Sequence, residues 1–97
     1  MSEKPANICV KAKVIGRVQG VWFRAWTSRE ADKLSLTGWV RNEPDGSVAA
    51  LICGPQDKVD ALCRLLWQGP DAAEVSRVEI DPASPPGAIM GFDIRRS

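Results

Sequence analysis

The sequence predicts an α+β fold in which two helices cover one face of an antiparallel sheet. Several short segments alternate apolar and polar residues, as strands with one buried face do. Two longer segments repeat apolar residues at helical spacing. Along the 97 residues these segments follow one another in the order βαββαβ, and a short extra strand comes last.

The first half of the chain reads as a strand, a helix and a hairpin. Residues 8–16 alternate between apolar and polar positions and predict a strand. Residues 22–34 change to helical spacing, although Thr27 dilutes the apolar stripe. Residues 36–42 and 47–53 suit a pleated surface, and the turn sequence EPDGS between them predicts a hairpin. The predicted apolar stripe of the helix consists of Phe23, Trp26, Ala31 and Leu34.

The second half reads as a helix and two strands. Gly54-Pro55 and Gly69-Pro70 bracket the helix, since proline suits a helix start and glycine a helix end. Residues 73–81 predict a strand, and residues 89–96 predict the short last one. The complete order is that of the split βαβ, or ferredoxin-like, α/β sandwich. The residues expected to anchor the two strands are Val78, Ile80, Phe92 and Ile94.

Length and charge limit the possible partners. We expect residues 1–97 to form one domain with an ordered core of about residues 8–95. Thirteen basic and 12 acidic residues give a net charge of +1, so no overall field attracts nucleic acid or anionic lipid. The N-terminal MSEKPANICV is too polar for a signal peptide, and no apolar run reaches the ~20 residues that span a bilayer. We therefore expect a cytoplasmic protein that binds neither nucleic acid nor membranes.

The cysteines suggest no metal or redox chemistry. Cys9, Cys53 and Cys63 form no C-x-x-C motif, and the chain has no histidine. The sequence therefore predicts no zinc site of the usual ligand types. We expect all three cysteines to be small apolar core residues in a reducing cytoplasm.

The turn GRVQGVWFR, residues 16–24, is the main candidate for a binding site. Gly16 and Gly20 allow positive φ, so successive backbone N–H groups can point into one concavity and hold an anion. The following helix adds its free N–H groups, and the guanidinium of Arg24 can donate two parallel hydrogen bonds to two phosphoryl oxygens. On spacing alone the turn could instead only close the chain, with Arg24 as a solvated charge. The motif lacks the lysine and Ser/Thr of a P-loop.

Two sequence blocks carry a resemblance to a known family. Residues 16–24 fit the pattern G-x-V-Q-G-V-x-F-R, and residues 38–46 fit G-W-V-R-N-x-x-D-G. At this separation the pair resembles the signature of the acylphosphatases. The similarity extends from Ile8 to Ile94 and includes WQGPDAAEVSRVEI and the closing GFDI.

The resemblance implies an enzyme that hydrolyses the carboxyl-phosphate bond of small acyl phosphates, without metal or cofactor. It implies that Arg24 grips the phosphoryl group and that Asn42 orients the attacking water. Taken alone, Asn42 reads as a residue that starts a turn. Inorganic phosphate is expected as product and inhibitor, and the enzyme is expected to be a monomer. The backbone that the resemblance assigns to the phosphate cradle belongs to Gly16, Arg17, Val18, Gln19, Gly20 and Val21.

The chain departs from the family pattern at three positions. Trp22 is bulky for a variable position and could narrow the pocket mouth, whereas Ser35 replaces a usual glycine and Ala49 a common glutamate. We expect the last two to affect stability rather than chemistry. One alternative function is a non-catalytic regulatory domain of the same fold that binds phosphate or carbamoyl phosphate. An RNA-binding domain is disfavoured because the strand at 47–53 has no aromatic residue for base stacking.

Overall fold

The structure, a computed structural model, describes residues 7–87 and 90–96. Five strands and two helices follow one another in the predicted order. No helix among these residues is long and apolar enough to cross a membrane. The elements are β1 (Asn7–Arg17), α1 (Phe23–Lys33), β2 (Thr37–Asn42), β3 (Val48–Pro55), α2 (Gln56–Leu66), β4 (Glu74–Pro82) and β5 (Phe92–Arg95).

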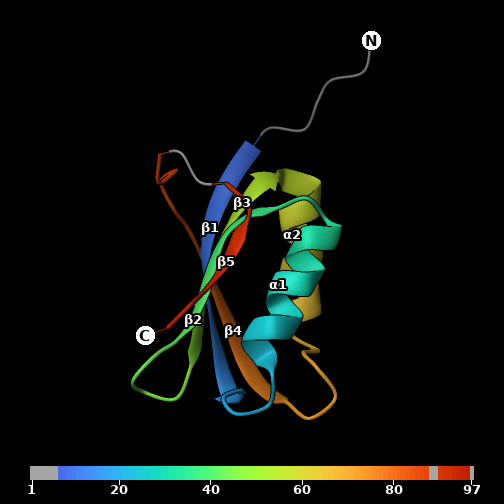
Figure 1. The fold of residues 1–97 in the computed structure, drawn as a ribbon, viewed down its shortest axis with the longest axis vertical. Coiled ribbons are helices and arrows are strands. Elements are labelled where there is room, and N and C mark those ends of the chain that lie inside the picture. The colour runs from blue at the N-terminus through green and yellow to red at the C-terminus, as the bar shows by residue number, and fades with distance from the viewer. Residues whose placement is uncertain (1–6, 88–89, 97) are drawn as a thin grey trace.

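The strands form one sheet in the order β4-β1-β3-β2-β5. Both helices lie on the same face of this sheet, and the other face is left open (Figure 1). The first four strands pair antiparallel, which confirms the predicted ferredoxin-like sandwich. The fifth strand runs parallel to β2, so the complete sheet is mixed. The sequence position expected to begin this strand, residue 89, lies outside the described residues.

The core lies between the sheet and the two helices. On β1 and β2 the buried positions alternate as the sequence indicated, whereas residues 48–52 of β3 are all buried. Val14, Val40 and Ile52 are completely buried. In α1 the buried residues are Phe23, Thr27 and Ala31, spaced four apart. Thr27 is therefore a polar residue within the otherwise apolar buried stripe, as the sequence indicated. Its hydroxyl is buried and has no hydrogen-bond partner among the residues that the structure describes.

Two isoleucines expected to anchor the edge strands are only partly covered. Ile80 of β4 pairs with Ala12 of β1, and Ile94 of β5 pairs with Val40 of β2, so both face the helices. Their side chains nevertheless remain 40% and 48% exposed, because each lies on an outermost strand. Phe92, at 7% exposure, is the anchor of β5.

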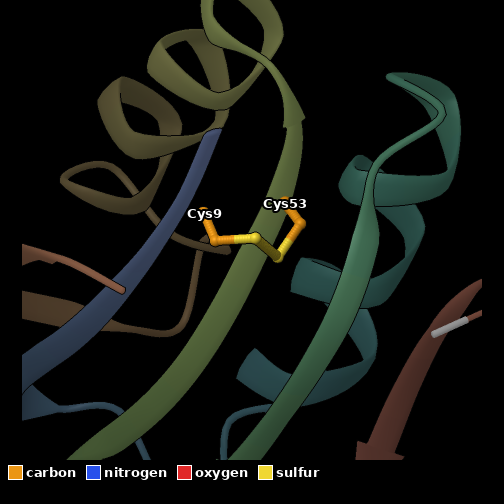
Figure 2. Close-up of a disulfide and its surroundings, with 2 residues drawn as sticks. All are labelled: Cys9 and Cys53. Carbon is orange, nitrogen blue, oxygen red and sulfur yellow. A yellow bond between two sulfur atoms is a disulfide. The ribbon is translucent and has the colours of Figure 1, made fainter. Parts of the chain in front are cut away.

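The cysteine prediction was wrong for two of the three residues. Cys9 and Cys53 are opposite each other on β1 and β3, with their Cα atoms 4.1 Å apart, and form a disulfide (Figure 2). The bond lies on the open face of the sheet, because the flanking alternate positions of β1 face the core. Cys63 is free and half-buried. Sequence spacing did not reveal the pair, because strand register brings together residues 44 positions apart.

Candidate active site

The turn between β1 and α1 leads directly into the N-terminus of the helix. Gly20 has φ 74°, and Trp22, the residue before the first helical one, has φ 65°. The first helical hydrogen bond runs from the Trp26 N–H to the Trp22 carbonyl oxygen, at 2.9 Å. The backbone N–H groups in the first turn of α1, before Trp26, therefore have no intrahelical partners and carry the positive end of the helix dipole. This geometry suits an anion.

The two glycines of the turn serve different purposes. Gly16 has φ 139° and lies at a register shift between β1 and β4, where a Cβ atom would collide with the Glu74 carbonyl oxygen. The close approach of β4 therefore requires glycine at position 16. A Cβ on Gly20, by contrast, would meet nothing within 4 Å. Of the two, only Gly20 faces the open space where a ligand could bind.

A pocket of about 420 Å³ opens beside this turn. It contains Arg24 from α1 and Asn42 from the end of β2, so the fold brings together the two residues predicted to be catalytic. Figure 1 shows the cause: the β1–α1 turn and the β2–β3 hairpin lie at the same end of the molecule. The pocket is lined by Val18, Gly20, Trp22, Phe23, Arg24, Ala25, Asn42 and Ile94.

The six residues of the predicted cradle are not equivalent. Val18 and Gly20 line the pocket, whereas Gly16, Arg17, Gln19 and Val21 are not among its lining residues. Val18 is 1% exposed and Val21 is buried, so these side chains fix the turn to the core. Arg17 is exposed at the end of β1.

Gln19 connects the turn to the hairpin that carries Asn42. Its side-chain amide donates to the Glu43 carbonyl oxygen at 2.8 Å and to the Ser47 carbonyl oxygen at 2.9 Å. These two bonds fix the hairpin base, immediately after Asn42, relative to the β1–α1 turn. From the sequence only the backbone of Gln19 was expected to take part in the site, because the two side-chain bonds join residues 24 and 28 positions apart.

Asp45 stabilises the hairpin loop, as expected for a turn residue. Its carboxylate accepts from the Ser47 backbone N–H at 2.9 Å and from the Ser47 hydroxyl at 2.5 Å. Lys13 on β1 forms an ion pair with it at 2.8 Å. The hydrogen bond from Lys13, and then those from Ser47, hold the pKa of Asp45 well below its usual value.

Arg24 is held at the edge of the pocket by β5. Its Nη1 donates to the Arg95 carbonyl oxygen at 3.1 Å. A guanidinium has five N–H donors, so this bond leaves several for an anion in the pocket. The sequence contained no signal for the contact, because it depends on β5 lying beside α1 across 71 positions.

The polar groups around the pocket favour an anion over a cation. Its lining residues include one arginine and one asparagine, and none of them carries a carboxylate. Within residues 7–87 and 90–96, no group of three or more His, Cys, Asp or Glu side chains is arranged to hold a metal ion. The fold and the site together define a ferredoxin-like domain with a pocket that suits an anion, at a helix N-terminus whose first turn carries an arginine.

Comparison with known proteins identifies the family. The acylphosphatase family model matches residues 10–94. An acylphosphatase of Pseudomonas aeruginosa is 52% identical over 91 residues, which cover 94% of this chain and 99% of that protein. An acylphosphatase of Sinorhizobium medicae is 51% identical over 84 residues, covering 87% and 89%. The structure of an acylphosphatase from Coxiella burnetii superposes with a TM-score of 0.89 at 36% identity, covering 98% of this chain and 100% of that one.

The chain therefore belongs to the acylphosphatase family, as the two sequence blocks predicted. It is an enzyme of that family, and the alternative of a non-catalytic regulatory domain is not favoured.

Proposed function

We propose that this enzyme hydrolyses small acyl phosphates, with Arg24 and the β1–α1 turn holding the phosphoryl group and Asn42 holding the attacking water. The observation that carries the proposal is that Arg24, Asn42 and Gly20 line one pocket at the N-terminus of α1. These groups come from two segments of the chain, and each matches a position in the two sequence blocks.

The reaction makes few demands on the protein. The water oxygen bonds to phosphorus, the bond from phosphorus to the acyl oxygen breaks, and the carboxylate leaves with the electron pair. A carboxylate is a good leaving group, so it needs no proton donor. In a loose transition state the charge resides on the phosphoryl oxygens, and catalysis consists of positioning and charge stabilisation.

Arg24 and the backbone amides supply the charge stabilisation. The guanidinium can donate two parallel hydrogen bonds to two phosphoryl oxygens. Amides near Gly20 and in the first turn of α1 supply further donors, and none of these groups must reorganise during the reaction. Residues 16–21 all contribute backbone to the proposed cradle, but the pocket lining supports Val18 and Gly20 most directly.

Asn42 is suited to orient water but not to deprotonate it. Its carboxamide has an oxygen that accepts and an NH₂ group that donates. The chain has no histidine to serve as a general base. We propose that the water proton passes to a phosphoryl oxygen of the substrate, so that the products are the carboxylate and dihydrogen phosphate.

The other properties expected from the sequence are proposals as well. We propose that the reaction needs no metal or cofactor, that inorganic phosphate inhibits as product, and that the enzyme acts as a monomeric single domain. A cytoplasmic location stays a prediction. Disulfides persist mainly in oxidising compartments, so a reducing cytoplasm should keep Cys9 and Cys53 as thiols. Alkylating the thiols at cell lysis and counting them therefore tests that location.

The test is benzoyl phosphate hydrolysis by the wild-type chain and by Arg24→Ala, with and without chelator. Removing one donor to the transition state costs ~2.7–4 kcal/mol, so kcat/KM should fall at least ~100-fold in Arg24→Ala. Arg29→Ala is the matched control, because Arg29 is an exposed arginine on the same helix and does not line the pocket. Wild-type turnover in a folded Arg24→Ala variant contradicts the assignment, and a strict metal requirement contradicts the metal-free mechanism.

A further inference from the structure

We propose that Trp22 and Ile94 form an apolar subsite for the acyl group, which makes aromatic and other bulky acyl phosphates better substrates than acetyl phosphate. The inference rests on the proposed function, since it places the phosphoryl group beside Arg24. Both residues line the same pocket as Arg24 and Asn42.

Trp22 combines an unfavourable backbone conformation with an exposed side chain. Its φ of 65° and ψ of 22° are left-handed, a region that bulky residues rarely adopt and that costs on the order of 1–2 kcal/mol. The side chain is 82% exposed, so little packing within the chain offsets this cost. Nor does the residue cap α1, because its side chain makes no capping hydrogen bond. An indole that is exposed yet lines a pocket is explained by contact with a ligand.

Ile94 forms the other apolar wall from β5. This strand runs along α1 in the opposite direction: the Ser28 hydroxyl donates to the Phe92 carbonyl oxygen, and Arg24 donates to the Arg95 carbonyl oxygen. Ile94 therefore lies beside the first turns of the helix. Its side chain faces the helices but is 48% exposed, whereas Phe92 is buried.

The pocket is larger than a phosphoryl group requires. Counting its three oxygens and the bridging acyl oxygen at the ~30 Å³ that a water takes in the liquid, the phosphate head of the substrate needs ~120 Å³. Most of the about 420 Å³ therefore remains for the acyl group. The other lining side chains near the start of α1, Phe23 and Ala25, are also apolar and offer no partner to a polar or charged acyl group.

The chemistry of these walls selects the acyl group. An aromatic ring can stack on the indole of Trp22 and contact the Ile94 methyl groups, whereas an acetyl group is too small to reach both. The contact does not change as the phosphoryl group transfers, so it strengthens the ground state and the transition state equally. It should therefore lower KM for aromatic substrates with little effect on kcat.

The experiment compares kcat/KM for benzoyl phosphate and acetyl phosphate in the wild type, Trp22→Ala and Ile94→Ala. The ratio of the two kcat/KM values should favour benzoyl phosphate in the wild type and fall ~10-fold in Trp22→Ala, mainly through a higher KM for benzoyl phosphate. Ile94→Ala should lower the same ratio. Inhibition by inorganic phosphate should change much less than the benzoyl KM, because phosphate has no acyl group.

The matched control is Trp67→Ala, which removes another exposed tryptophan that does not line the pocket and should leave both activities unchanged. The inference is overturned when the wild type does not prefer benzoyl phosphate, or when Trp22→Ala lowers turnover of both substrates equally. A wild-type chain that hydrolyses neither substrate overturns the proposed function as well. If Trp22→Ala is active and its ratio of the two kcat/KM values equals that of the wild type, only the acyl subsite is contradicted and the proposed function stands.

Discussion

Reduction of the Cys9–Cys53 disulfide should destabilise the fold without impairing the site. The bond joins two central strands and closes a loop across a sequence separation of 44. The chain-entropy model gives ~4 kcal/mol for a loop of this length. With an unfolding entropy of ~0.2 kcal/mol/K for a chain of this size, that corresponds to a fall in Tm of ~20 °C.

Catalysis in the folded, reduced enzyme should be unchanged. Asn42 pairs with Val48, which lies five residues along β3 from Cys53, or ~17 Å at the usual rise per residue. The third cysteine should not exchange into the bond. Burial and the nearby charge of Asp60 raise the pKa of Cys63 to about 11, so it stays a protonated, unreactive thiol near neutral pH.

The assay is urea unfolding of oxidised and reduced protein, together with benzoyl phosphate kinetics without denaturant. A thiol titration in denaturant should give one free thiol before reduction and three after it. A midpoint that stays the same after the thiol count has risen to three contradicts the stabilising role. A loss of kcat/KM in the folded, reduced protein contradicts the separation of the disulfide from the site.

Three further predictions concern single residues. Asn42→Ala should lower kcat at least ~100-fold while the inhibition constant of inorganic phosphate changes little, since Asn42 acts on water; equal losses in both would contradict this role. Ser35→Gly should raise the free energy of unfolding in urea by ~0.5–1 kcal/mol, because Ser35 has φ 57° just after α1, where glycine is unstrained. Asp45 has a lowered pKa in the folded state, so its contribution to stability is present above about pH 4 and is lost as pH falls further. Asp45→Asn should therefore weaken the acid dependence of the urea midpoint, and an unchanged dependence would contradict the Lys13 contact.

Local patterns were sufficient to predict the order of the elements. The alternation through β1 and the turn signal between β2 and β3 each involve neighbouring residues, and both elements lie where they were expected. Arg24 and Asn42 were found through the two sequence blocks, and the fold brings them into one pocket.

Features that depend on strand order or register were not predicted. The Cys9–Cys53 bond needs the register of β1 against β3, and the need for glycine at position 16 comes from β4. Likewise, the partial exposure of Ile94 follows from its place on an edge strand.

The most direct test of the account is a titration of the wild-type chain with inorganic phosphate, followed through backbone amide and arginine side-chain NMR signals. Hydrogen bonding to an anion should shift the amides of residues 18–25 and the Nε–H of Arg24, and the shifts should saturate together. The signals of α2 and of the strand ends near the disulfide should hardly move. Saturating shifts at another surface, or none in this turn at concentrations that inhibit hydrolysis, would contradict the claim that these amides and Arg24 hold the phosphoryl group.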